Sequence, residues 1–250
     1  MKKRIGKMLC GCLVVLGGLF TVGCSSEDGE NRLSFTGFFS ISGESPNYKL
    51  MDDAGNLFYP TQESVMTVTD NKGFGKNKRV QLNGSYLEED FRYTNGGKNF
   101  EVKNVTLRGG QYLITQKAMT REEMKEQNLL ALDSLFSVSG FQQCWAWNGY
   151  LNTMTTAAYC MVGAVAKVPS FNMYVVPEKT GENVLTVAVA YNRHMPKATP
   201  VAGESVYVHS FDISGIEVPG QDSVVINVEM EGVAPRKTKV ARTVFERTWE

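Results

Sequence analysis

The chain has 250 residues, of which 42% are hydrophobic and 21% charged, with 26 basic and 26 acidic side chains. This is the composition of a globular protein, and it lacks the clustered basic residues that binding to nucleic acid requires. About 225 residues remain after the leader described next, enough for one large or two small domains.

Residues 1–23 are predicted to be a signal peptide. Four basic residues lie within the first seven positions, and an almost wholly apolar run of about 15 residues follows at 8–22, too short for the roughly 20 residues of a spanning helix. Thr21-Val22-Gly23-Cys24 then resembles the bacterial lipobox, in which the cysteine is acylated with palmitate-type chains and becomes the new N-terminus. At the position of Thr21 the lipobox usually has Leu or Val, so this residue departs from the pattern. The alternatives are an ordinary signal peptide cut elsewhere and an uncleaved anchor.

Residues 24–32 are expected to form an acidic tether, because Ser25-Ser26-Glu27-Asp28-Gly29-Glu30 is a solvated sequence. Removal of the leader leaves 22 basic against 26 acidic residues, a net charge of about −4. We therefore expect the membrane as a partner, through the lipid, and no nucleic acid.

Residues 33–120 are predicted to form a small β-barrel domain. Two β-prone runs, 48–51 and 57–60, flank an Asp/Gly/Asn cluster at 52–56, which indicates a hairpin. Further short strands are expected around 33–41, 79–82, 91–93, 100–107 and 112–114. Five or six short strands in this length favour a barrel.

Residues 121–136 are predicted to form a helix that connects two domains. Thr120 and Glu123 have the spacing of a capping box. Apolar residues then recur at helical spacing at Met124, 129, 130, 132 and Leu135.

Residues 137–250 are predicted to form an antiparallel β-sandwich. Turn residues separate seven short β-rich segments, expected at 144–157, 160–168, 173–176, 184–191, 206–213, 223–230 and 238–245.

The chain resembles the NigD-like lipoproteins of Bacteroidetes. The resemblance covers most of the chain, and it rests on Cys24, the Lys49-Leu50-Met51-Asp52-Asp53-x-Gly55-x-Leu57-x-x-Pro60 hairpin, Arg79-Val80, and Gly149-Tyr150-Leu151-Asn152. It implies an N-terminal OB-type barrel and a C-terminal β-sandwich. It implies no functional residue, although one member occurs in a bacteriocin gene cluster, for which a role in immunity has been supposed.

The residues that carry chemistry form no familiar catalytic or metal-binding motif. Of the two histidines, His194 is expected in a loop and His209 in a strand, and two isolated histidines rarely make a metal site. Asp52-Asp53 is better explained by the hairpin turn than by acid/base or calcium chemistry. Glu88-Glu89-Asp90 is typical of a solvated loop. We expect no enzyme activity, no metal and no cofactor.

Cys144 and Cys160 are the cysteines that remain after the leader and the lipidated Cys24. In an exported protein an even pair suggests a disulfide, and closing this loop would stabilise the fold by about 3 kcal/mol. Two separate buried thiols are an equally good alternative. The Cα separation determines whether a disulfide can form, and the sequence does not give that distance.

Trp145, Trp147 and Tyr150 have an alternating spacing that places 145 and 147 on one face of a strand. An outward face would offer a platform for a sugar ring or a protein partner. The favoured alternative is that these aromatic residues fill the core of the sandwich.

Two features resemble signals of exported Bacteroidetes proteins. The acidic tether is similar to the signal that sends lipoproteins to the cell surface, so we expect a surface-exposed outer-membrane lipoprotein, with the periplasmic leaflet as the alternative. Asp133-Ser134-Leu135 and Asp222-Ser223-Val224 resemble O-glycosylation sequons at Ser134 and Ser223, although such tripeptides also occur by chance.

The leading hypothesis is therefore a tethered, non-catalytic binding or accessory module with an unknown protein or glycan partner. An immunity protein against a bacteriocin-type toxin, by analogy with the family, is the second. A hydrolase with an unfamiliar site is the third.

Overall fold

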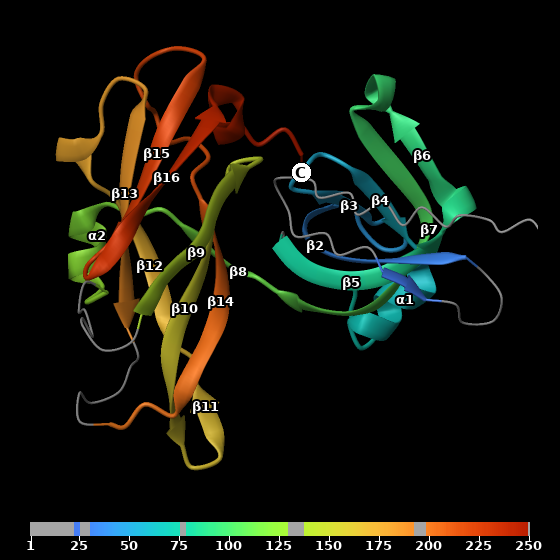
Figure 1. Ribbon diagram of the computed structural model, residues 1–250, viewed down its shortest axis with the longest axis horizontal. Helices are drawn as coiled ribbons and strands as arrows, with labels where there is room; N and C mark the ends of the chain where they lie inside the picture. Colours follow the sequence, from blue (N-terminus) through green and yellow to red (C-terminus); the bar gives the residue numbers. More distant parts are fainter. Residues whose placement is uncertain (1–22, 26–30, 76–78, 130–137, 193–198, 250) are drawn as a thin grey trace, which may run out of the picture. The chain divides into compact units, whose positions relative to one another are not determined.

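The computed structural model describes residues 23–25, 31–75, 79–129, 138–192 and 199–249 (Figure 1). The chain divides into two compact units, residues 1–111 and 112–250, and each is described by itself. Both consist mainly of β-strands, which confirms the predicted fold class. Among the described residues, no helix combines the length and the apolar character needed to cross a bilayer.

The first unit is a closed barrel of the OB type. Its strands are β1 (Gly23–Ser25), β2 (Arg32–Ser42), β3 (Lys49–Asp52), β4 (Leu57–Pro60), β5 (Arg79–Leu87), β6 (Phe91–Thr94) and β7 (Asn99–Tyr112). The ring order is β2-β3-β4-β7-β5, and β5 pairs again with β2 to close it. The β4–β7 pairing is parallel, whereas β2 pairs antiparallel with both β3 and β5. A closed ring leaves none of these five strands as a sheet edge.

The short helix α1 (Gln62–Val68) lies between β4 and β5 in the chain. Its N-cap is Thr61, whose hydroxyl accepts a hydrogen bond from the Ser64 backbone N–H at 3.3 Å. Val65 is buried in the barrel core, and the Ser64 hydroxyl donates to the carbonyl of Val105 in β7. The sequence here has no strong helical period, so the helix is not apparent from it.

Aromatic rings make up the centre of the barrel core. The ring of Phe58 lies 5.1 Å from the rings of both Phe35 and Phe39, and 5.7 Å from that of Phe100. Phe35 and Phe39 are four residues apart on the long strand β2, so they point to the same side of it. The alternation of aromatic residues along these strands thus supplies the interior of the barrel.

The second unit is a sandwich of two sheets. Its strands are β8 (Ile114–Lys117), β9 (Val138–Trp147), β10 (Tyr150–Val162), β11 (Val165–Lys167), β12 (Ser170–Val175), β13 (Val184–Asn192), β14 (Gly203–Asp212), β15 (Ser223–Met230) and β16 (Val233–Ala241). One sheet has the order β11-β10-β14-β8, with β9 also paired to β10, and the other has the order β12-β13-β15-β16. Leu151 and Phe211 of the first sheet share a core with Phe171, Leu185 and Ile226 of the second.

The sandwich differs from the purely antiparallel one expected. The pairings β13–β15 and β8–β14 are parallel. The segment 144–157, expected as one strand, is instead a hairpin, because Asn148 and Gly149 both take positive φ angles, 45° and 77°, and turn the chain between β9 and β10. Asn-Gly is the preferred pair for such a two-residue turn, since it tolerates these angles.

The helix expected at 121–136 is much shorter. Helix α2 spans Arg121–Glu126, and the predicted capping box between Thr120 and Glu123 is present. The helix ends because Asn128 adopts a φ of +56°, a left-handed conformation that stops helices. Residues 130–137 lie outside the described part of the chain.

The helix is also not a connector between the two units. Strand β8, which precedes it, pairs with β14, and Met119 pairs with Tyr174 of β12. These pairings bring residues 114–119 into the second unit, whereas the sequence predicts them as part of the first. The boundary consequently lies near residue 111 instead of 120.

Candidate functional site

Asp52 has the turn role predicted for it. One of its carboxylate oxygens accepts hydrogen bonds from the backbone N–H groups of Ala54 and Asn56, both at 2.8 Å, and the other accepts from the Asn56 side chain at 2.7 Å. Desolvation by burial raises the pKa of Asp52 to about 6. The carboxylate is thus enclosed by its own hairpin, where no substrate reaches it.

Asp53 has a role that the sequence did not reveal. Its two oxygens accept hydrogen bonds from the two terminal nitrogens of Arg79, at 2.6 and 2.9 Å, and both side chains are almost fully buried. Arg79 also donates to the hydroxyl of Ser40 in β2. This bidentate ion pair joins the β3–β4 hairpin to the start of β5, so it is an internal tie of the barrel.

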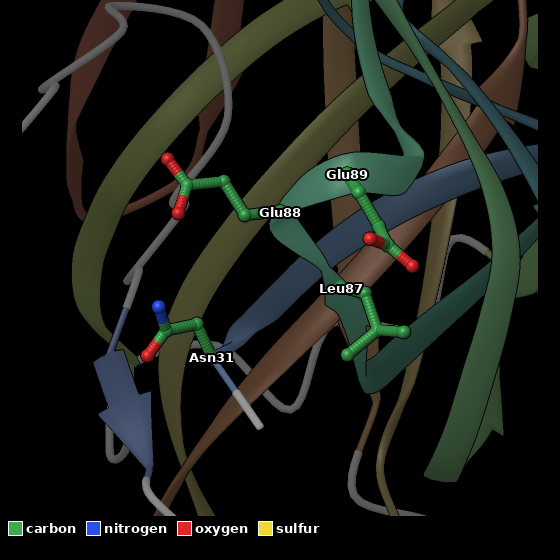
Figure 2. A pocket seen from close by; sticks show the side chains of 4 residues that line it. All are labelled: Asn31, Leu87, Glu88 and Glu89. Atoms are coloured by element: carbon green, nitrogen blue, oxygen red, sulfur yellow. The ribbon is translucent and has the colours of Figure 1, made fainter. Parts of the chain in front are cut away.

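Glu88 and Glu89 lie at an open depression of about 570 Å³, together with Asn31 and Leu87. Both glutamates are exposed, and Figure 2 shows that their carboxylates are directed apart. The third acidic residue, Asp90, accepts a hydrogen bond from Asn104 at 2.8 Å. The arrangement fits the solvated loop face expected, because paired acid/base chemistry needs two carboxylates aimed at one point.

His209 lies in strand β14, on the core side of the sandwich. Its ring centroid is 4.4 Å from that of Phe171, and neither ring nitrogen has a hydrogen-bond partner. Desolvation lowers the pKa of His209 to about 4, so the ring is neutral at physiological pH. Within the described residues no three potential metal ligands come together. His194 lies outside those residues.

No disulfide joins Cys144 to Cys160. Cys144 in β9 is the register partner of Thr153, which is seven residues from Cys160 along β10, or about 23 Å at the rise of a strand. A disulfide needs a Cα separation below about 7 Å, so the alternative of two separate thiols fits the structure. Burial raises the pKa of Cys144 to about 12, which keeps it protonated and a poor nucleophile.

The three aromatic residues lie on the face of their sheet opposite to the core that the two sheets share, so Trp145 and Trp147 do not fill that core, whereas Tyr150 is only 2% exposed and is buried as expected. Trp147 pairs directly with Tyr150 across the β9–β10 hairpin, and Trp145 is two residues away on the same side. Ala146 and Leu151 point to the opposite side and belong to the core. Trp145 and Trp147 are half-buried, and the Nε1 atom of Trp147 is itself buried without a hydrogen-bond partner.

Tyr150, in contrast, is covered by the segment 246–249. The guanidinium of Arg247 lies 4.5 Å from the centre of the Tyr150 ring and forms a 2.8 Å ion pair with Asp212 of β14. Asn148 holds the same segment, because its Oδ1 accepts from the backbone N–H groups of Thr248 and Trp249 and its Nδ2 donates to the Trp249 carbonyl. Of the three aromatic residues, only the two tryptophans therefore remain as a candidate binding face.

The modification sites are placed as far as the described residues allow. Gly23–Ser25 form strand β1, in which Cys24 pairs with Leu33 of β2. Ser223 is half-buried at the start of β15, where its backbone N–H donates to the carbonyl of Gln221. Ser134 and the signal peptide up to residue 22 lie outside the described part of the chain.

Arg79, Asn148 and Arg247 were not predicted as important residues. Arg79 and Gly149 belong to the motifs of the family resemblance, but nothing in the sequence pairs Arg79 with Asp53, 26 positions away. The Asn-Gly pair at 148–149 is the one local signal in the sequence that indicates the turn between β9 and β10. No local pattern indicates that Asn148 binds residues 100 positions later.

No protein-family model matches the chain, and no curated protein matches it in sequence. Solved structures of similar fold include a toxin-related protein from Parabacteroides distasonis, with 15% identity over 86% of this chain and 94% of that one and a TM-score of 0.54. A lipoprotein from Bacteroides fragilis shares 13% identity over 83% of this chain and 96% of that one, with a TM-score of 0.51.

A NigD-like immunity protein from Bacteroides caccae shares 13% identity over 83% of this chain and 92% of that one, with a TM-score of 0.49. The structures similar to this chain thus include a protein of the family that its sequence resembles. At these identities the likeness concerns the fold alone.

Proposed function

We propose that the chain is an outer-membrane lipoprotein, anchored through Cys24 and facing the cell surface, that binds a partner without catalysing a reaction. The observation that carries the binding role is the outward position of Trp145 and Trp147 on the β9–β10 hairpin. Tryptophans on a rigid sheet offer a large apolar contact area at a small entropic cost.

The non-catalytic part of the proposal rests on how the chemically capable side chains are used. Asp53 is neutralised by Arg79, His209 is neutral beside Phe171, and Cys144 is a protonated thiol. Each of these groups is engaged in or enclosed by the fold, whereas catalysis needs groups that face a substrate.

The lipid anchor is supported by the lipobox and by the likeness in fold to a lipoprotein from Bacteroides fragilis. Growth with radiolabelled palmitate tests it directly. We expect label on the native chain and none on Cys24→Ala, while protease added to intact cells digests the native chain. Label that persists on Cys24→Ala would contradict the anchor, and a protease-resistant chain would place it in the periplasmic leaflet.

Site-specific photocrosslinking tests the binding face. A photoreactive amino acid replaces Trp145 in one variant and the exposed Lys237 of β16 in a matched control. We expect a discrete adduct on living cells from position 145 only. The same adducts from both positions, or none from either, would contradict a binding role for this face.

A further inference from the structure

The β10–β11 hairpin ends in an exposed apolar tip, Met161–Val168. All eight residues of this tip are exposed, and seven of them are apolar or glycine. The eighth, Lys167, is the one charged residue that the sequence contains between Asp133 and Glu178, whereas 21% of the whole chain is charged. Apolar side chains that are exposed together mark a surface that meets a partner protein or a membrane.

The apolar tip extends beyond the strands that flank β10 (Figure 1). Strand β10 pairs with β14 as far as Tyr159 and with β9 as far as Ala157, whereas its last three residues, 160–162, pair with β11. Three residues of strand are about 10 Å long. Gly163 opens the two-residue turn with a φ of 62°, the positive angle that a type II′ turn needs at this position. The tip is thus a short two-stranded ribbon that is closed by a tight turn.

Both faces of this ribbon are apolar. Val162 and Val165 are register partners and lie on one face, whereas Met161 points to the other. A protein partner covers one face of a ribbon, but a bilayer surrounds both. The tip also holds only eight residues, and a standard protein interface takes about 20–30 from each partner. These features favour a membrane over a second copy of the chain.

The charge and the length of the tip also suit the surface of a bilayer. Lys167 is cationic, and the tip contains no acidic residue that would repel the phosphate groups of lipids. Interfacial protein segments enter the boundary between headgroups and acyl chains by about 5–10 Å, which a ribbon of this length spans. Deeper entry is unfavourable, because β11 lies at the edge of its sheet and would bring backbone polar groups into hydrocarbon.

We propose that the apolar tip inserts into the headgroup region of the bilayer that holds the lipid anchor, as a second membrane contact of the chain. The inference goes beyond the proposed function and rests on the anchor at Cys24 within it. The anchor keeps the chain at a bilayer, so the tip meets that surface at a high effective concentration and needs only a small apolar area to bind. The contact holds the second unit at the membrane surface.

A polarity-sensitive dye on the tip tests the proposal. The full lipidated chain is reconstituted in vesicles of phosphatidylethanolamine and phosphatidylglycerol, and Val165→Cys carries the dye NBD. The exposed Lys237 of β16, replaced by cysteine and labelled in the same way, is the matched control. Cys160 is buried and Cys144 stays protonated, so the dye reacts at the introduced cysteine. We expect a blue shift at position 165, and quenching by nitroxide-labelled lipid about twofold or more above that at position 237.

A charge placed in the tip tests the same contact. Val162→Asp, combined with the dye at position 165, should lower the quenching to the level of position 237, because an acidic group resists burial among lipids. Ile114→Asp, at another exposed apolar residue of this unit, should leave the quenching unchanged. Circular dichroism confirms that each variant is folded before it is compared.

Quenching that is equal at positions 165 and 237, or that survives Val162→Asp, overturns the proposal. A blue shift at position 165 that needs no vesicles and grows with protein concentration also overturns it, because the tip then contacts a second copy of the chain. Flotation of the same vesicles reports the lipid anchor separately. A chain that floats without quenching at position 165 disproves the tip contact and leaves the anchor standing, whereas palmitate labelling fails only if the anchor is wrong.

Discussion

Arg79 and Asp53 form a bidentate ion pair inside the barrel unit. One terminal guanidinium nitrogen donates to one carboxylate oxygen at 2.6 Å, and the other nitrogen donates to the other oxygen at 2.9 Å. Their side chains are 0% and 1% exposed. Since neither group reaches water, each depends on the other for neutralisation.

Removal of one partner is therefore expected to be costly. Arg79→Met removes the bidentate partner of the buried Asp53 carboxylate, which should destabilise the barrel by about 3–5 kcal/mol. Hydrogen exchange of β2 and β5 peptides measures the loss. The control is Glu101→Gln, which breaks the exposed 3.6 Å pair with Lys103 and should cost below about 1 kcal/mol. Similar losses in both variants would show that burial does not determine the strength of the Arg79–Asp53 pair.

The stability of the sandwich should fall as the solution becomes acidic. The pKa of His209 is about 4 in the folded state against 6.5 in the unfolded state, so the unfolded chain binds more protons between these values. The unfolding free energy consequently decreases as the pH falls from 6.5 to 4, by about 3 kcal/mol in total. Urea titrations followed by tryptophan fluorescence measure it, because all three tryptophans lie in this unit. In His209→Leu the unfolding free energy should vary less with pH. An unchanged slope in that variant would show that another group causes the pH dependence.

Asp52 should give the barrel a dependence of the opposite sign. Its folded pKa is raised from 3.8 to about 6, so the folded state binds the extra proton. Protonated Asp52 therefore adds about 3 kcal/mol to the free energy of unfolding below pH 3.8, and this contribution is lost as the pH rises to about 6. Hydrogen exchange of the β3–β4 hairpin at several pH values, in the native chain and in Asp52→Asn, measures it. Identical pH profiles in the two proteins would disprove the assignment.

Asn148 should determine whether the segment 246–249 stays docked. Asn148→Gly keeps the positive φ of the turn but removes the side-chain hydrogen bonds to Thr248 and Trp249, at roughly 1 kcal/mol each. We expect faster exchange of the 246–249 amides and a red shift of tryptophan emission. Asn148→Asp, which keeps the acceptor and loses the donor, should lie between the native chain and Asn148→Gly. The prediction fails if glycine at this position leaves both signals unchanged.

The two thiols should stay unmodified in the native protein. Cys160 is 1% exposed, and the raised pKa of Cys144 leaves almost no thiolate at pH 8. Maleimide labelling without a reducing agent should therefore modify both residues only after unfolding in guanidinium, as read by mass spectrometry. Detection of a peptide that links Cys144 to Cys160 would contradict the register of β9 and β10.

The sequence indicates local features well and distant pairings poorly. The capping box at Thr120, the hairpin at 52–56 and most strands of both units follow from spacing and turn residues. The helix length was overestimated because apolar periodicity alone does not reveal the left-handed Asn128 that ends it. The parallel pairings, the Arg79–Asp53 pair and the outward face of Trp145 and Trp147 depend on how the strands order themselves, which residue spacing does not encode.

The parallel pairing of β8 with β14 determines where the chain can be divided for separate expression. A fragment that begins at the helix, near residue 121, lacks β8 and leaves the backbone amides of His209 to Asp212 along an open strand edge. Such an edge is a template for association between copies, so this fragment is expected to aggregate. A fragment that begins at Tyr112 retains β8, covers that edge and should remain monodisperse.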